Sequence, residues 1–103
     1  MSRHDFEVLS AEDLTRTSGG IAMPAAARFI MMHESSGHTT AKNPHSSAFG
    51  AFQLTAANRR HYMGHHMRST SFGAQYTAAT HYVRDRYGSW ERAKSFWLRH
   101  HYY

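Results

Sequence analysis

The sequence predicts a small, mainly α-helical domain with four to five short helices and at most a small β-hairpin. The length of 103 residues suits one modest core, and 41% hydrophobic against 18% charged residues is the balance of a globular chain. Apolar residues recur at helical spacing in several segments, and glycine, proline and serine separate those segments. We therefore expect short helices joined by loops, forming one domain over residues 21–103.

The first helix of this domain is expected to begin at Pro24, because proline suits the first turn of a helix. Three alanines follow closely and favour helix, and Gly37 is expected to close it. Residues 37–51 are rich in glycine, asparagine, serine and threonine. This composition predicts a loop or a short hairpin.

Hydroxyl side chains mark the starts of the later helices, because they can cap free backbone N–H groups. Thr55 is expected to cap a short helix that runs to about Met63. Ser71 opens a longer helix that Gly88 stops, and Ser89 caps the last one. Helical spacing predicts core positions on these last two helices at Tyr76, Val83, Trp90 and Phe96.

Residues 1–20 are expected to form a separate lead-in to the domain. Ser10 can cap a helix there with acids in its first turn, and Gly19-Gly20 ends it. The lead-in is either a short helix packed on the domain or a docking tail for a virion or another protein partner. The sequence leaves both alternatives open.

The formal net charge of +5 favours anionic partners: nucleic acid, membrane surfaces or bacterial wall polymers. The chain has no cysteine, which excludes disulfides, thiolate metal sites and thiol nucleophiles. No apolar run reaches the roughly 18 residues of a membrane span. Aromatic residues make up 14% of the chain, and in a cleft such rings can stack on sugars or bases.

The most informative segment is Glu34-Ser35-Ser36-Gly37, followed by Asn43-Pro44 and by residues 47–53. It places Glu34 in the last turn of a predicted helix, where the helix dipole disfavours ionisation of a carboxylate. Phe49 and Phe52 are candidates for an apolar wall that would raise the pKa of this carboxyl further. A carboxyl that stays protonated can act as a general acid, which is the chemistry that breaks glycosidic bonds.

The remaining acids of the domain do not make a convincing partner for Glu34. Asp85 lies between two arginines, which predicts a solvated, salt-bridged helix face. Glu91 falls in the first turn of the last helix, where an acid stabilises the helix. The sequence thus favours a mechanism with a single acid.

The segment from His33 to His38 nearly matches the zinc-protease pattern H-E-x-x-H. That pattern places its histidines four residues apart on one helix face, whereas a spacing of five turns the second about 140° away from the first. Gly37 would also interrupt the helix between them. We expect no metal site and no cofactor.

These motifs resemble a known family. The segments Glu34-Ser35-Ser36-Gly37, Asn43-Pro44 and Ala48-x-Gly50-x-Phe52-Gln53 are similar to the lysozyme-like domain of soluble lytic transglycosylases. The second half looks closest to the cell-wall lytic domains of aggregation-promoting and resuscitation-promoting factors, on Gln75, Tyr82, Arg86-Tyr87-Gly88-Ser89-Trp90, Ala93, Phe96-Trp97 and His101-Tyr102-Tyr103. The resemblance covers about residues 24–103, but an asparagine-glycine segment that many larger transglycosylases carry is missing.

The resemblance implies cleavage of the β-1,4 bond between N-acetylmuramic acid and N-acetylglucosamine in peptidoglycan. Glu34 would be the catalytic acid and base, first protonating the glycosidic oxygen. In transglycosylases the same glutamate then takes a proton from the muramyl C6 hydroxyl, which closes a 1,6-anhydro ring. The residues implied to contact the glycan strand are Gln53, Phe52, Ser47, Tyr82, Trp97 and Tyr102.

Other interpretations remain beside this one. Gln53 could instead satisfy backbone groups of its loop, and Tyr82 and Trp97 could belong to the core. The whole chain could be a non-catalytic lysozyme-like protein that binds the wall or builds a phage particle. A basic nucleic-acid-binding module is less favoured, because the arginines are scattered and no nucleic-acid fold signature accompanies them.

The first residues of the chain lack the apolar core of a signal peptide. We expect the protein to act at the bacterial cell wall. It would arrive there as a phage product, packed in the virion or released by a holin, or as a wall enzyme whose export signal is not part of this sequence.

Overall fold

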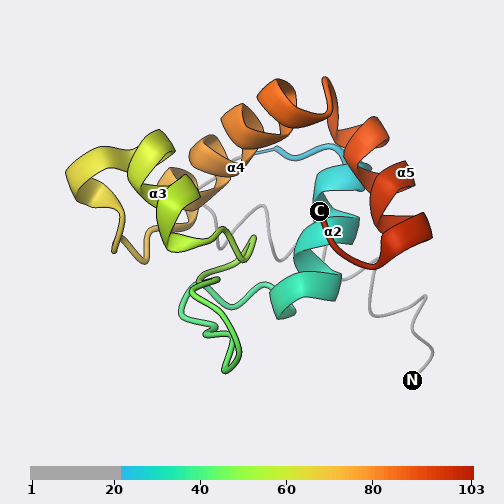
Figure 1. Ribbon diagram of the computed structural model, residues 1–103. Helices are drawn as coiled ribbons and strands as arrows, with labels where there is room; N and C mark the ends of the chain where they lie inside the picture. The colour runs from blue at the N-terminus through green and yellow to red at the C-terminus, as the bar shows by residue number, and fades with distance from the viewer. Residues whose placement is uncertain (1–21) are drawn as a thin grey trace.

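The computed structural model describes residues 22–103, which form four α-helices joined by loops (Figure 1). The helices are α2 (Ala25–Ser35), α3 (Ala56–Met63), α4 (Phe72–Arg86) and α5 (Trp90–His100). A short 3₁₀ turn, η1 (Gly64–His66), directly follows α3. The predicted small, mainly α-helical fold is confirmed for this part of the chain. The expected lead-in helix or tail, residues 1–20, lies outside the described residues.

The three predicted hydroxyl caps are confirmed. Each side-chain oxygen accepts a hydrogen bond from the backbone N–H three residues later, as an N-cap does. The pairs are Thr55 with Asn58 (3.3 Å), Ser71 with Ala74 (3.3 Å) and Ser89 with Arg92 (3.1 Å). These caps set the starts of α3, α4 and α5.

The end of α2 differs slightly from the prediction. Ser36, not Gly37, is the first residue to leave the helix, with a left-handed φ of 56°, and its N–H donates to the Met32 carbonyl at 3.1 Å. Gly37 continues the turn with a φ of 83°. Two successive residues with positive φ reverse the chain sharply, so the half-buried Glu34 and Ser35 lie at the end of the last helical turn.

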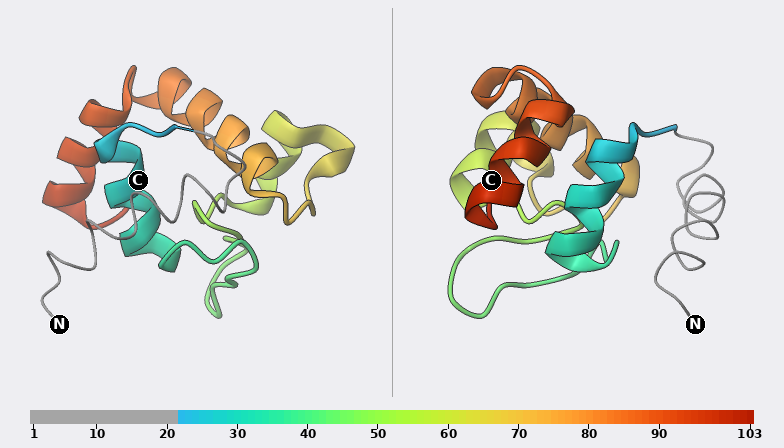
Figure 2. Two further views of the ribbon diagram at one scale, coloured as in Figure 1. Left: turned by 180° about the vertical axis from the view of Figure 1, so that it is seen from behind. Right: turned by 90° about the vertical axis from the view of Figure 1, so that its right-hand side faces the viewer.

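The loop between α2 and α3 contains only isolated β-bridges. Phe49 pairs in antiparallel fashion with Lys42 on one side and with Leu54 on the other. This agrees with the predicted loop or small hairpin, and the described residues contain no longer strand. The loop extends to one side of the helices in Figures 1 and 2.

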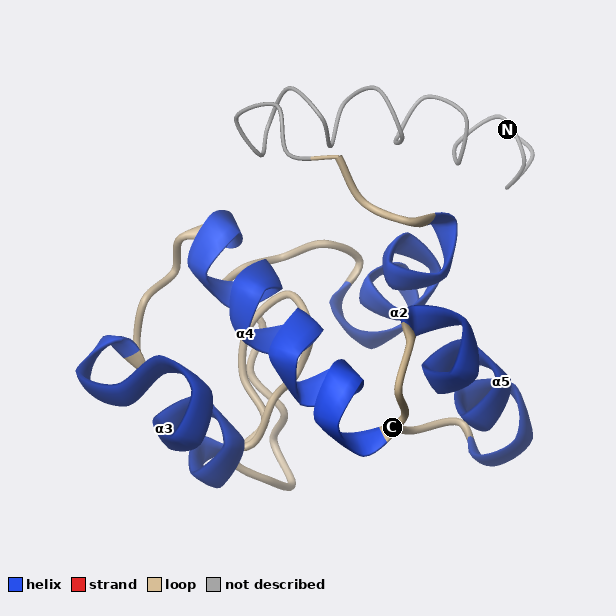
Figure 3. Cartoon of the chain, turned by 90° about the horizontal axis from the view of Figure 1, so that it is seen from above, coloured by secondary structure: helices blue, strands red, loops and turns tan. Residues whose placement is uncertain are grey.

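The helices surround one core. In all views α2 and α5 lie side by side, α4 connects them to the rest of the domain, and α3 packs against α4 at the far end (Figures 2 and 3). Phe52, from the loop, is among the largest fully buried side chains together with Ile30, Met31 and Val83. Trp90 is also buried, as predicted, while Tyr76 and Phe96 are partly buried. No helix within residues 22–103 has the length and apolar character to cross a membrane.

Candidate functional site

The structure brings Glu34 and Trp97 together. Glu34 lies in the last turn of α2 and Trp97 lies on α5, and because these helices are neighbours the two side chains meet. The indole Nε1–H of Trp97 donates a hydrogen bond of 2.7 Å to Glu34 Oε2. Both residues are half-buried, so the carboxylate faces apolar surroundings on one side and solvent on the other.

An aromatic cluster flanks this carboxylate. Trp97 packs edge-on against Phe29, with ring centroids 5.5 Å apart, and against His33 at 4.8 Å. Phe29 and His33 are themselves 4.1 Å apart, one helical turn from each other on α2. The His33 ring nitrogen Nδ1 lies 2.9 Å from the Phe29 carbonyl oxygen, which fixes the imidazole on the helix.

Burial raises the pKa of the Glu34 carboxyl above its ordinary value. Two smaller effects act in the opposite direction: the hydrogen bond from Trp97 and the positive charge of His33 both favour the carboxylate. Because burial is the largest of these effects, the protonated form of Glu34 is favoured relative to a carboxyl in water. A carboxyl poised in this way has the property that a general acid requires.

Ser35 ties the end of α2 to the loop that contains Phe52. Its hydroxyl oxygen lies 2.6 Å from the Ala51 carbonyl oxygen and 3.2 Å from that of Met31, so the shorter contact is the better acceptor for its single proton. The same oxygen accepts a hydrogen bond from the N–H of Gly37 at 3.0 Å. Ser35 thereby holds the end of α2, which contains Glu34, against residues 48–53, which we call the second motif.

Gln75, on α4, hydrogen-bonds the backbone of the second motif and of two neighbouring loop segments. This buried amide accepts a hydrogen bond from the Ala51 N–H at 2.8 Å and donates to the Thr39 and Ser69 carbonyls, each at 2.9 Å. Gly50 makes the close approach possible, because a Cβ at that position would lie 2.8 Å from the Gln75 side chain. In the sequence, Gln75 is a polar residue at helical spacing from the apolar Phe72 and Ala79, and this position indicates a buried amide that bonds backbone groups.

Tyr103, the last residue, also reaches the site. Its hydroxyl donates a hydrogen bond of 2.7 Å to the Phe52 carbonyl. Burial raises the pKa of the Tyr103 phenol well above its ordinary range, and the negative charge of Glu34 raises it further. No individual role is predicted from the sequence for Ser35, Gln75 or Tyr103, although all three stand in the segments that carry the family resemblance.

Two predicted glycan contacts in the second motif face inward. The Phe52 side chain is 1% exposed, so it belongs to the core; its prediction as a substrate-binding ring is corrected, because a covered ring cannot stack on a sugar. The Gln53 amide nitrogen donates to the carbonyls of Ala41 (3.0 Å) and Gly50 (2.9 Å). Gln53 therefore holds the loop backbone together, in the arrangement that the alternative interpretation described.

The remaining predicted contacts lie in different places. Tyr82 is buried among Tyr62, Tyr87 and Tyr103, and burial raises its pKa to about 12. It is a core residue, the alternative given for it above. Tyr102 is 56% exposed and packs edge-on against Phe96. Of the glycan contacts expected from the sequence, only Trp97 therefore touches Glu34.

The other two acids of the described region lie on α4 and α5. Asp85 accepts a hydrogen bond of 2.8 Å from the Tyr62 hydroxyl, and Glu91 is exposed in the first turn of α5. The His38 ring nitrogen Nδ1 lies 2.9 Å from the Ser35 carbonyl oxygen. Within residues 22–103 no three histidine or carboxylate side chains gather as metal ligands.

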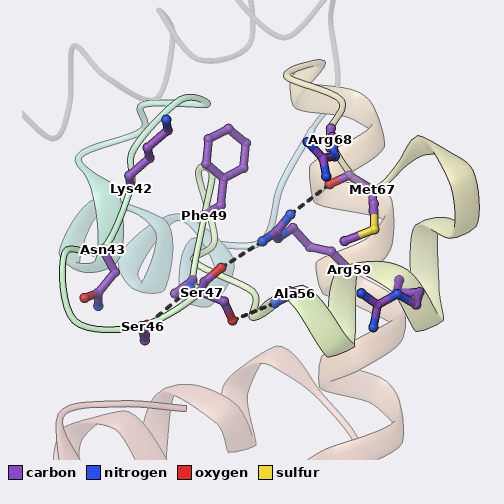
Figure 4. A pocket seen from close by; sticks show the side chains of 11 residues that line it. Lys42, Asn43, Ser46, Ser47, Phe49, Ala56, Arg59, Met67 and Arg68 are labelled. Carbon is purple, nitrogen blue, oxygen red and sulfur yellow. Dashed lines mark hydrogen bonds between the residues drawn. The ribbon is translucent and has the colours of Figure 1, made fainter.

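A cavity of about 550 Å³ is found in another part of the domain (Figure 4). The loop from Lys42 to Phe49, helix α3 and the segment Met67–Arg68 line it, and Ser47 is among these residues. Its lining contains neither Glu34 nor Trp97. We place the candidate catalytic site at Glu34 nevertheless, because acid chemistry requires a carboxyl and the cavity lining has none.

Comparisons of the chain with family models, with curated proteins and with solved structures find no match. What the site does is therefore inferred from its own residues and geometry.

Proposed function

We propose that this protein is a peptidoglycan-cleaving lytic transglycosylase, or a muramidase, with Glu34 as its single acid and base. The observation that carries the proposal is the half-buried Glu34 at the end of α2, whose pKa is raised by burial. The motif around it resembles that of lysozyme-like transglycosylases. The net charge of +5 suits an anionic bacterial wall, where the protein would act.

In the proposed reaction the Glu34 carboxyl gives its proton to the oxygen of the β-1,4 bond between N-acetylmuramic acid and N-acetylglucosamine. The bond breaks as positive charge develops on the muramyl ring, and the glutamate is left as a carboxylate. That carboxylate then takes the proton of the C6 hydroxyl, whose oxygen closes the 1,6-anhydro ring. In a muramidase, the carboxylate would deprotonate a water molecule instead. That water would attack C1 of the muramyl ring, the carbon to which the C6 oxygen bonds in the transglycosylase.

The acids of residues 22–103 support a single-acid mechanism. A retaining glycosidase that forms a covalent intermediate needs a second carboxyl about 5 Å from the first. Asp85 is bonded to Tyr62 on α3, and Glu91 is exposed at the start of α5. Neither shares a hydrogen-bond partner with Glu34.

The decisive experiment is Glu34→Gln, assayed as release of soluble fragments from purified peptidoglycan. General acid–base catalysis contributes about 10²–10⁴-fold, so we expect the rate to fall by at least about 100-fold. Circular dichroism must show that the variant is folded. Glu91→Gln is the matched control, because it removes one exposed negative charge from the same domain and should leave the rate unchanged. Wild-type activity in Glu34→Gln would refute the assignment.

Mass spectrometry of the released fragments separates the two reactions. Anhydro-muramyl ends are expected from a transglycosylase, because ring closure replaces the attack of water. Reducing ends would instead identify a muramidase with the same acid.

One observation favours a second candidate, a non-catalytic protein that binds the wall or forms part of a phage particle. Glu34 is engaged by Trp97, and the Gln53 amide is directed to the backbone instead of to an open cleft. For this candidate, the protein should sediment with insoluble peptidoglycan and release no fragments. The same assay with wild-type protein distinguishes the two.

A further inference from the structure

The 550 Å³ cavity between the α2–α3 loop and α3 is strongly basic. Four of its lining residues carry positive charge: Lys42, Arg59, Arg60 and Arg68. None of its lining residues is acidic. The volume is in the range of pockets that hold small molecules or single units of a polymer, about 300–1,000 Å³. Figure 4 shows Lys42 on one side of Phe49, and Arg59 and Arg68 on the other.

Arg59 is the fixed centre of this cavity. Its guanidinium donates to three backbone carbonyls: Nε to Leu54 (3.0 Å), Nη1 to Met67 (3.1 Å) and Nη2 to Ser47 (2.8 Å). These bonds join the loop, α3 and the segment after η1, so the side chain has little freedom. A guanidinium has five N–H groups, which leaves one on each Nη atom for a ligand.

The positive charge of Arg59 has neutral partners. Carbonyl oxygens satisfy its hydrogen bonds without cancelling its charge, and its guanidinium lies over the Phe49 ring, 5.3 Å from the centroid. Burial lowers the pKa of Arg59, and the nearby charges of Arg68 and Arg60 lower it further. Like charges held this close repel one another, and an anion bound among them would relieve that repulsion.

The lining suits a phosphate group or a chain of phosphates better than a single carboxylate. Arginine N–H pairs match phosphate oxygens, and several cations gathered in one volume suit a group of more than one charge or a chain of successive phosphates. A single-stranded nucleic acid would need exposed aromatic faces for its bases. The only aromatic ring in the lining is Phe49, and Arg59 covers one of its faces.

We propose that the basic cavity around Arg59 binds the phosphodiester of an anionic wall polymer and holds the protein on its substrate. This inference rests on the proposed function for the source of the phosphate. The cavity and the Glu34 site share no lining residue, so the cavity serves attachment and takes no part in bond cleavage.

The test follows the Arg59 Nε–H signal by NMR, since its bond to the Leu54 carbonyl protects it from exchange. Inorganic phosphate should shift this signal saturably, while acetate at equal ionic strength should not. A short poly(glycerol phosphate) should bind more tightly than inorganic phosphate. It should also bind more tightly than a single-stranded oligothymidine with the same number of phosphates.

The variant Lys42→Gln/Arg68→Gln removes two cavity charges and spares the structural Arg59. Its affinity for poly(glycerol phosphate) should fall by about two- to thirtyfold, because each exposed charge contact contributes roughly 0.2–1 kcal/mol. The matched control Arg84→Gln/Arg99→Gln removes two exposed charges from α4 and α5 and should keep wild-type affinity.

Several results would overturn the inference. The Arg59 Nε–H signal could shift linearly with phosphate and never saturate, or it could respond equally to acetate. Arg84→Gln/Arg99→Gln could lose as much affinity for poly(glycerol phosphate) as Lys42→Gln/Arg68→Gln. Oligothymidine could bind more tightly than poly(glycerol phosphate). Each readout uses the isolated protein without peptidoglycan. A failure here is therefore distinct from a failure of the Glu34→Gln lysis assay.

Discussion

The indole N–H of Trp97 hydrogen-bonds the Glu34 carboxylate across 63 residues of sequence, at 2.7 Å. This bond and burial act on the carboxyl in opposite directions. Burial raises the pKa of Glu34, whereas a donor to the charged form lowers it. The balance between them sets the fraction of protein in which Glu34 is protonated at a given pH.

Replacing Trp97 with phenylalanine should therefore raise the pKa of Glu34. The apolar ring is kept, while the donor that stabilises the carboxylate is lost. In the proposed reaction this moves the alkaline limb of lytic activity to higher pH. NMR titration of the Glu34 carboxyl carbon measures the pKa directly, even where activity is low.

Trp90→Phe is the matched control for this change. The indole nitrogen of Trp90 is buried and has no hydrogen-bond partner within the described structure. Its removal should leave the titration of Glu34 in place. A fall in the Glu34 pKa of Trp97→Phe, or an equal shift in both variants, would contradict the role given to the Trp97 donor.

The stability of the protein should depend on pH through Glu34. Its pKa is raised in the folded state, so between the unfolded and folded values the native state holds more protons. Stability from this group is present below the unfolded pKa and is lost as pH rises through the raised one. Glu34→Gln should thus gain stability relative to wild type as pH increases through that window.

Urea unfolding of both proteins between about pH 4 and pH 7 measures this difference, since the ordinary pKa of glutamate is near 4.3. Glu91→Gln again serves as the control with an exposed carboxyl. If the stability of Glu34→Gln relative to wild type stayed constant or fell as pH rises, burial would not be the dominant effect at Glu34.

The local features of the fold could be predicted because they depend on nearby residues. Thr55, Ser71 and Ser89 cap helices through bonds to N–H groups three residues away, so short sequence patterns contain them. Glu34 was singled out for a similar reason: its helix end and its glycine break are adjacent in the sequence.

The features that sequence could not predict depend on packing between distant segments. Neighbouring Phe52 and Gln53 were both expected in a cleft, but the tertiary turn directs one into the core and the other onto carbonyl groups. Tyr103 reaches the Phe52 carbonyl from 51 residues away. No periodicity or motif records such a contact, because it follows from how α5 lies on α2.

Gln75→Leu should destabilise the domain although it keeps a similar side-chain volume. The change leaves one N–H and two carbonyl groups without their amide partner. Each buried unsatisfied group costs about 1–3 kcal/mol, and with partial relaxation we expect a total loss of about 2–4 kcal/mol in urea unfolding. Hydrogen exchange at the Ala51 N–H should also become faster.

Thr80→Val offers the contrast on the same helix. The Thr80 hydroxyl is buried and has no hydrogen-bond partner among the described residues, so its removal should be neutral or stabilising. If Gln75→Leu were as mild as Thr80→Val, the amide would contribute volume alone.

Gly50→Ala should cost more stability than the same change at Gly64. Both glycines have positive φ, 92° and 59°, a backbone conformation that L side chains rarely adopt, so alanine is strained at each, by about 1–3 kcal/mol. At Gly50 the new Cβ would also lie 2.8 Å from the Gln75 side chain, whereas at Gly64 nothing lies within 4 Å. Overpacking adds about 1–3 kcal/mol. Gly50→Ala should therefore lose stability through both backbone strain and overpacking, whereas Gly64→Ala should lose only the part due to backbone strain.

The contact with Gln75 can be isolated by a double-mutant cycle. In a Gln75→Ala background the new Cβ at Gly50 has room, so the extra cost of Gly50→Ala should largely disappear. Urea unfolding gives the four free energies. An additive cycle would mean that backbone strain, not contact with Gln75, requires glycine at position 50. A coupling of about 1 kcal/mol or more would place the Gly50–Gln75 contact among those that shape the loop beside Glu34.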